Sequence, residues 1–244
     1  MNLFAEAIAW IFSGNPGAGL APIPIALGQH LWFTFVSVLV AALIAGPLGW
    51  LIGHTGKGRA IAVAISGAAR AIPSFGLLIL LFLLLGVLRT TEAAIITFVL
   101  LAIPSILAGA YTGFEAIDRK VIDAAQAMGM TQWQILWRVE VPLGLSLLVA
   151  GLRSATLQVV ATVTIAAFIN LGGLGQYILA GIPLRRFEIV LGGALLVAAL
   201  ALVLDGVFAL LQRASVPAGV RAAQSHHSVP QRSASARTAA VGAS

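Results

Sequence analysis

Few side chains in this chain of 244 residues could carry out covalent or acid–base chemistry. Cysteine is absent, and His54, His226 and His227 lack the spacing to other ligands that a metal site requires. The sequence holds no Ser/His/Asp set, no pair of carboxylates with a supporting base and no G-x-x-x-x-G-K-[ST] loop for nucleotide phosphates. We therefore expect no catalytic residue, no metal site and no cofactor in this chain, and structural or solvated histidines.

The remaining candidates are polar residues isolated inside long apolar segments. Arg153 follows Pro142 by eleven residues, which is about 16 Å along a helix. An arginine at that depth in a membrane is costly and normally faces protein or a water-filled path. It is expected either to line a translocation route or to form an ion pair with Glu140, Glu188 or Asp205, and the sequence leaves both interpretations open.

Gln158, Thr162 and Thr164 place further polar groups on the same apolar segment. Such groups often form hydrogen bonds between membrane helices, and they would also suit a polar path for a charged solute. Arg70, in an earlier segment, has the same two explanations as Arg153, and an ion pair is favoured there because it lies near the expected inner surface. Arg153, Gln158 and Thr162 are the candidate residues of a translocation path.

The most polar internal stretch is DRKVIDAAQAMGMTQWQILWRVEVP, residues 118–142. Asp118 has the side chain of a helix N-cap, and Gly129 lies where a glycine commonly ends a helix. Apolar residues recur between them at i, i+3, i+4 and i+7, which predicts one apolar face formed by Val121, Ala124, Ala125 and Met128.

A second short helix is predicted directly after Gly129. Thr131 and Gln134 have capping-box spacing, and Pro142 suits the first turn of the next long helix, where its missing N–H costs little. Residues 118–142 are thus expected to form a helix, a glycine turn and a second helix before the chain enters the membrane. An ordinary loop between two spans is the simpler alternative.

Composition indicates what positions these residues. Hydrophobic residues make up 60% of the chain and charged residues only 9%, which is far outside the usage of soluble proteins and indicates a polytopic membrane protein. The formal net charge is +6, but the basic residues are scattered along membrane flanks, with no basic patch interleaved with aromatics. Membrane topology therefore explains them better than nucleic-acid binding does.

We expect an all-α membrane helix bundle with five transmembrane spans, at about 30–53, 59–88, 92–112, 143–168 and 187–211. The second is too long for one straight span. Pro73 divides it into an inner helix to about Ala71, a break at Ile72-Pro73-Ser74 and a span to Leu88. Small residues that would let helices pack closely recur in the first span, at Gly46, Gly49 and Gly53.

Tryptophans mark expected membrane surfaces. Trp32 and Trp50 lie near the two ends of the span at 30–53, as an aromatic belt would place them. Trp133 and Trp137 lie four residues apart on the second short helix of the polar stretch. They are expected either to anchor that helix at the lipid headgroups or to pack on a partner protein.

The chain divides into three regions. Residues 1–29 are expected to form an external or interfacial segment with a surface helix and a loop, and no basic residue precedes the first apolar run, which argues against a cleavable signal peptide. Residues 30–213 form the transmembrane domain, with a Gly-rich external loop at 170–182. Residues 214–244, rich in Ser, Ala, Arg and Gln, are expected to be a disordered cytoplasmic tail.

Positive charges predict the orientation. Nine basic residues fall on the expected cytoplasmic side: Lys57, Arg59, Arg119, Lys120, Arg138, Arg213, Arg221, Arg232 and Arg237. Three fall on the expected external side: Arg89, Arg185 and Arg186. This asymmetry predicts an external N-terminus and a cytoplasmic C-terminus.

The stretch 118–142 resembles the EAA loop of ABC-importer permeases. The shared pattern is Asp123-Ala124-Ala125, three residues, Gly129, nine residues and Val139-Glu140-Val141-Pro142. The family pattern has Glu, Ile and Leu where this chain has Asp123, Val139 and Val141, changes that keep charge or apolarity. In that family the loop forms short coupling helices that dock into a groove of a cytoplasmic ATPase. The resemblance implies this ATPase-coupling role for Asp123, Ala124, Ala125, Gly129 and Pro142.

Three further elements resemble one subgroup, the osmoprotectant permeases that import glycine betaine, choline, carnitine and related solutes. They are Ile72-Pro73-Ser74, Tyr111-Thr112-Gly113 and Gly172-Gly173-Leu174-Gly175, and the resemblance covers about residues 28–213. The Gly-rich element is shared with methionine-type permeases. A permease for methionine or another amino acid is therefore the alternative.

The resemblance implies a type I ABC-importer permease in the cell membrane, with a second permease chain, identical or different, two ATPase subunits and an extracytoplasmic solute-binding protein. ATP would be bound and hydrolysed by the ATPase subunits, so this chain would not itself be an enzyme, and the binding protein would set most of the solute specificity. A membrane-embedded enzyme would need a cluster of ionisable residues inside the membrane, which the sequence lacks. A scaffold protein would have no reason to carry the coupling pattern.

Overall fold

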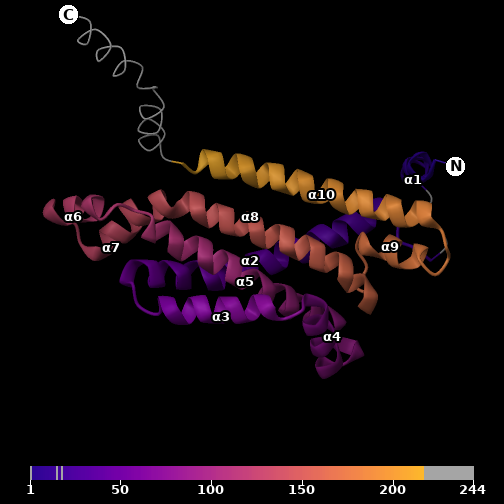
Figure 1. Ribbon diagram of the computed structural model, residues 1–244, viewed down its shortest axis with the longest axis horizontal. Helices are drawn as coiled ribbons and strands as arrows, with labels where there is room; N and C mark the ends of the chain where they lie inside the picture. The colour runs from indigo at the N-terminus through magenta and orange to yellow at the C-terminus, as the bar shows by residue number, and fades with distance from the viewer. Residues whose placement is uncertain (1, 15, 18, 217–244) are drawn as a thin grey trace, which may run out of the picture.

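The computed structural model describes residues 2–14, 16–17 and 19–216, and within them it shows helices and connecting segments but no strand. Four long helices lie side by side and form the body of the molecule (Figure 1). They are α2 (Ile23–Thr55), α5 (Thr90–Glu115), α8 (Val141–Ala166) and α10 (Phe187–Ala214). Each belongs to a helical stretch that is long and apolar enough to cross a membrane, so the expectation of an all-α membrane bundle is confirmed.

Close backbone packing joins α5 to α8. A Cβ atom on Gly109 would lie 2.6 Å from the carbonyl oxygen of Leu147, and one on Gly113 would lie 2.6 Å from that of Gly144. Small residues let membrane helices approach in this way. The two helices can therefore be this close only because glycine occupies these positions.

Two of the three glycines singled out in the first span also lie close to α5. A Cβ atom on Gly49 would overlap with Ala110 of α5, and one on Gly53 would lie 2.8 Å from the Cβ of Phe114. Gly49 and Gly53 thus permit close packing, as expected. A Cβ atom on Gly46 meets nothing within 4 Å, so the expectation was wrong for Gly46.

The predicted second span is a sharply bent pair of helices. α3 (Arg59–Ala71) and α4 (Ser74–Leu85) meet at the predicted break but differ in direction by 85°. The sequence predicted a span from this break to Leu88. The helix found there, α4, has 12 residues and is about 18 Å long, which is too short to cross a membrane alone. The short helix η1 (Val87–Arg89) then leads into α5.

The N-terminal region differs from the expected division at residue 29. α2 already begins at Ile23. Pro22 is its N-cap and Pro24 lies in its first turn, where the N–H groups have no partner within the helix and proline is therefore tolerated. The expected surface helix is α1 (Leu3–Phe12), and it packs on α10. There the Trp10 ring lies so close to Gly192 that a Cβ atom on the glycine would overlap with it.

The Gly-rich region at 170–182 contains a helix, α9 (Gly175–Gly181), rather than only a loop. Its Tyr177 is fully buried and packs edge-on against Trp10, with the ring centroids 5.2 Å apart. Before it, η3 (Ala167–Ile169) ends α8. The expected tail at 214–244 lies outside the described residues from 217 onward.

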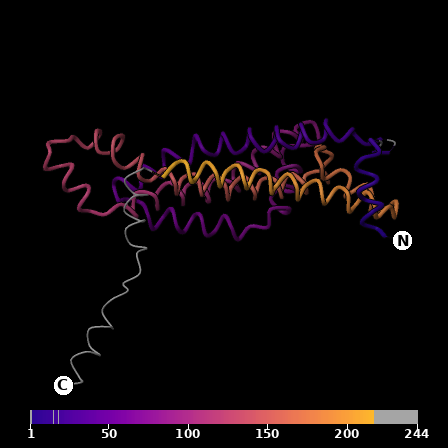
Figure 2. Tube along the Cα trace, turned by 90° about the horizontal axis from the view of Figure 1, so that it is seen from above, coloured from indigo at the N-terminus to yellow at the C-terminus, as the bar shows by residue number. Residues whose placement is uncertain are grey.

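The connections gather at two opposite ends of the bundle. α6 (Arg119–Ala127) and α7 (Gln132–Ile135) lie at the end where α2 and α10 finish, and they project beyond the other helices (Figures 1 and 2). α1 and α9 lie at the other end (Figure 1). This arrangement agrees with a membrane-spanning domain whose polar stretch stands clear on one side.

Candidate functional site

The polar stretch folds into two short helices joined by a glycine turn, here called the α6–α7 hairpin (residues 118–135). Asp118 caps α6, since its carboxylate accepts a hydrogen bond of 2.9 Å from the Lys120 N–H. Gly129 has φ +80°, a left-handed conformation that glycine adopts without strain. Thr131 and Gln134 form the reciprocal capping box, with hydrogen bonds of 2.9 and 3.3 Å. All three local predictions are confirmed.

The expected apolar face of α6 is only partly buried. Of the four residues predicted for it, Val121, Ala124 and Met128 are exposed, and only Ala125, at 3% exposed, is buried. The Ala125 carbonyl oxygen also accepts a hydrogen bond from the Met130 N–H across the turn. The hairpin projects from the bundle (Figure 1), which agrees with the exposure of most of α6. Ala125 is thus a packing residue of the hairpin, and Ala124 belongs to its free surface.

The second short helix does not end before Pro142. A π-helical turn, η2 (Leu136–Glu140), joins α7 to α8, and the Val141 N–H donates to the carbonyl oxygen of Leu136, five residues back. Proline inside a regular helix removes one i→i−4 bond and clashes with a carbonyl. The wider turn before Pro142 accommodates it within one continuous helical stretch, Gln132–Ile169.

A row of aromatic rings connects the hairpin to the bundle. Trp133 packs edge-on against Trp137, with centroids 5.6 Å apart, and Trp137 packs edge-on against Trp50 of α2 at 5.8 Å. Trp50 in turn stacks on Phe114 of α5 at 6.5 Å. Trp137 is therefore held by this chain itself, whereas Trp133 remains 68% exposed.

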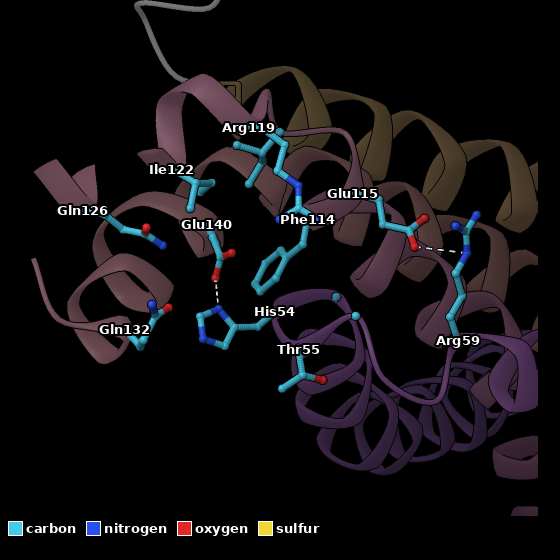
Figure 3. Close-up of a pocket in the computed structure, with 13 residues that line it drawn as sticks. His54, Thr55, Arg59, Phe114, Glu115, Arg119, Ile122, Gln126, Gln132 and Glu140 are labelled. Atoms are coloured by element: carbon cyan, nitrogen blue, oxygen red, sulfur yellow. Dashed lines mark hydrogen bonds and ion pairs between the residues drawn. The ribbon is translucent and has the colours of Figure 1, made fainter. Parts of the chain in front are cut away.

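A cleft of about 620 Å³ lies between the hairpin and the adjoining ends of α2 and α5 (Figure 3). In it the His54 Nδ1 atom, at the end of α2, forms a short contact with the Glu140 carboxylate of η2, and Glu140 is only 7% exposed. Arg59 pairs with Glu115 at 3.1 Å on the rim. The sequence predicted no partner for His54. Glu140 is 86 residues away, so no local sequence pattern indicates that the two side chains meet.

Arg153 has the ion-pair partner that was one of its two predicted explanations. Its Nε and Nη2 atoms donate to the two carboxylate oxygens of Asp205 on α10, each at 2.6 Å. Such a two-bond contact fixes the orientation of both side chains. Arg153 therefore ties α8 to α10. Arg70 is exposed, and the described part of the chain offers it no ion pair.

The threonine hydroxyls of α8 are satisfied within that helix. The Thr162 hydroxyl donates to the carbonyl oxygen of Gln158, and the Thr164 hydroxyl to that of Val160. These are bonds to the preceding turn, so in this chain the two threonines do not link helices. Thr162 is buried and Gln158 is half-buried, and a role in a translocation path remains a prediction for both.

A second polar cluster, at the opposite end of the bundle, was not predicted. The Gln29 side chain accepts a hydrogen bond from the Gly173 N–H at 3.1 Å, and His30 Nδ1 accepts one from the Leu174 N–H at 3.3 Å. His30 Nε2 then donates to the carbonyl oxygen of Val160 at 3.1 Å, so both nitrogens of the neutral ring have a hydrogen-bond partner. The start of α2 thereby fixes the Gly-rich region.

Tyr177 fixes the same region from α9. Its hydroxyl donates to the carbonyl oxygen of Ala21 at 2.6 Å. Burial raises the pKa of Tyr177 to about 12, so the hydroxyl keeps its proton at neutral pH. In the part of the chain that the structure describes, no three His, Cys, Asp or Glu side chains gather as a metal site would require. His226 and His227 lie outside that part.

Comparison with known proteins decides the family. The family described as "binding-protein-dependent transport system inner membrane component" matches residues 45–216. The chain belongs to this family. It is thus a permease, the membrane subunit of a binding-protein-dependent transport system.

Curated relatives of this permease cover most of both chains. It is 31% identical over 194 residues to the glycine betaine/carnitine/choline transport system permease protein OpuCB of Bacillus subtilis, covering 80% of this chain and 88% of OpuCB. It is 35% identical over 199 residues to the osmoprotectant import permease protein OsmW of Salmonella typhimurium, covering 79% and 91%.

Solved structures support the fold. The permease superimposes on a chain of the inward-facing MetNI methionine ABC transporter with a TM-score of 0.69 and 23% identity, covering 80% of this chain and 96% of that one. At this identity the likeness concerns the fold alone. It confirms the expected ABC-importer permease architecture.

Proposed function

We propose that this permease is the membrane-spanning subunit of an ATP-driven importer for osmoprotectants such as glycine betaine, choline or carnitine. The observation that carries the proposal is the 31–35% identity, over about four-fifths of the chain, to permeases named for these solutes. The alternative, methionine or another amino acid, is supported by the shared Gly-rich element and by solved structures of such transporters, to which the likeness is one of fold.

The α6–α7 hairpin is the surface through which ATP hydrolysis in a partner subunit would act on this permease. It projects from one end of the bundle, and Asp123 and Ala124 are exposed on it. A small side chain such as Ala124 leaves room for α6 to lie close to a groove. Gly129 sets the angle between the two helices, and Pro142 begins α8, into which the second helix continues.

Two ATPase subunits, a second permease chain and an external binding protein would complete the importer. The ATPases would dock on the cytoplasmic side, which the excess of basic residues assigns to the end that carries the hairpin. Their closure on ATP would push on the hairpins and switch the pair of permeases between inward-facing and outward-facing states by rigid-body motion. Gln158 and Thr162 are candidates for the path, while Arg153 braces α8 against α10.

The test is uptake by the assembled system. The permease would be expressed with its own ATPase and binding protein, and membrane vesicles would be supplied with ATP and radiolabelled solute. We expect uptake of at least one of glycine betaine, choline and carnitine, competed by the unlabelled compound and not by methionine. Uptake of methionine with none of the three would replace the proposal by the amino-acid alternative.

A further inference from the structure

The bend between α3 and α4 places irregular backbone at membrane depth. α3 starts at Arg59, which pairs with Glu115 at the hairpin end of the bundle. Its 13 residues span about 20 Å, so the break at Ile72-Pro73 lies inside a hydrocarbon core of about 30 Å. A helix end leaves backbone carbonyl and N–H groups without helical partners.

This bend is also open on the surface of the single chain. Ile72 is 48% exposed and Phe75, in the first turn of α4, is 40% exposed. Irregular backbone is not found facing lipid, because its polar groups would lack partners. It occurs at membrane depth only where other protein covers it or where it lines a water-filled cavity. The open side of the bend therefore faces something other than lipid.

An exposed aromatic pair marks the bend. The Phe75 ring packs edge-on against Phe168, the middle residue of η3, with the centroids 5.3 Å apart and an angle of 86°. Phe168 is 63% exposed although it lies in a membrane helix close to its outer end. One side of each ring is thus available to another molecule.

Two hollows adjoin the pair. A hollow of about 340 Å³ is lined by both Phe75 and Phe168, and one of about 660 Å³ is lined by Phe168 together with Thr90, Thr91 and Asn170. Among the described residues, neither lining includes an acidic or basic side chain. Most of the lining of both hollows is aliphatic, and to this the two hollows add phenylalanine rings, three threonine hydroxyls and one amide.

From these observations we propose that Phe75 and Phe168 contact the quaternary ammonium group of the solute on its way through the permease. This inference rests on the proposed function, since it uses the solute class. A trimethylammonium group has no N–H and so cannot donate a conventional N–H hydrogen bond. It is attracted to aromatic faces instead, and the absence of carboxylates around the rings keeps this attraction weak enough for release.

Reactivity of introduced thiols tests whether the pair lines a watery path. The chain contains no cysteine, so Phe75→Cys and Phe168→Cys each supply a single thiol in this permease. In the assembled importer we expect both to react with a water-soluble thiosulfonate that carries a trimethylammonium group. During transport, glycine betaine or choline should slow the reaction and methionine should not.

Uptake tests the contact itself. Phe168→Leu and Phe75→Leu should lower the maximal uptake of glycine betaine and choline about fivefold, the size of one exposed cation–π contact. Phe168→Tyr keeps an aromatic face and should retain uptake. Phe187→Leu is the matched control, because Phe187 is 57% exposed but lines neither hollow, and its uptake should match that of the unmodified permease.

Each failure has its own signature. The inference is overturned if the unmodified permease imports these solutes while both Leu variants keep full uptake, or if the thiols at 75 and 168 do not react. An equal loss in Phe187→Leu would also overturn it, because the effect would then be general. If the unmodified permease imports none of the three osmoprotectants, it is the proposed function that fails.

Discussion

Two neighbouring alanines of α6 have opposite surroundings, and their substitution separates docking from folding. Ala124 is exposed, so Ala124→Trp should leave the permease inserted and folded but reduce co-purification of the ATPase and uptake together. Ala125 is buried, so Ala125→Trp should overpack the hairpin and destabilise it by about 1–3 kcal/mol. Thermal unfolding of the purified permease, measured beside ATPase co-purification, checks both. Full uptake by Ala124→Trp would remove this surface from the coupling element.

Gly129 is under a conformational rather than a spatial constraint. With φ +80° and nothing within 4 Å of a Cβ atom, its replacement meets no clash but strains the backbone. We expect Gly129→Val to cost about 1 kcal/mol or more and to turn α7 away from its direction. Insertion should be normal, while solute-stimulated ATP hydrolysis and uptake fall. Near-normal values of both would show that the angle of the hairpin is unimportant.

The contact between His54 and Glu140 joins α2 to the π turn of the helix that follows the hairpin. His54→Ala would leave a nearly buried carboxylate without this partner, which should destabilise the permease by about 1–3 kcal/mol. The double variant His54→Ala/Glu140→Ala should lose less than the sum of the two single variants. The free energies of unfolding of all four proteins form the cycle that checks this, and additive values would mean that the pair does not interact.

For individual residues, the sequence predicted only interactions between near neighbours in the chain. The cap at Asp118, the turn at Gly129 and the capping box at Thr131 depend on residues within four positions, so their patterns are legible. The pairs His54–Glu140 and Arg153–Asp205 join residues 86 and 52 positions apart. Three acidic partners were open for Arg153, and only the packing of α8 on α10 selects Asp205.

Among the helices, the contact of α5 with α8 depends most directly on the absence of side chains. Gly109→Ala should drive a methyl group into the backbone of α8 and lower stability by about 1–3 kcal/mol. Gly46→Ala is the matched control, since its methyl group enters open space and removes the flexibility of a helical glycine. Unfolding temperatures in detergent compare the two, and equal values would contradict the close packing.

Pro73 predicted where the second span breaks but not how far it bends. Proline interrupts a helix whatever its surroundings, whereas the 85° angle depends on where α4 finds partners in α5 and α8. α9 was missed for a related reason. A helix of seven residues has little stability alone, and it forms here because Tyr177 and Gly181 are buried against other helices.

For the whole molecule, composition and hydropathy sufficed to predict the bundle, and charge predicts its orientation. A reporter fused after Leu211 should be cytoplasmic, and one inserted near Gln176 should be external, because nine expected cytoplasmic basic residues oppose three external ones. Activities of paired alkaline phosphatase and green fluorescent protein fusions measure this. The opposite result at both sites would invert the proposed docking side.

The unbroken helical stretch Gln132–Ile169 has a mechanical consequence. Its 38 residues make a rod about 57 Å long, with the hairpin at one end and Phe168 at the other. The glycine contacts with α5 lie between the ends, so they would act as a fulcrum. Phe168 lies 17 residues, about 26 Å, beyond Gly151, and a tilt of about 12° about that glycine would move it by about 5 Å, close to the rise of one helical turn. Leverage, rather than a relay of side chains, would then carry the force of ATP hydrolysis to the outer mouth.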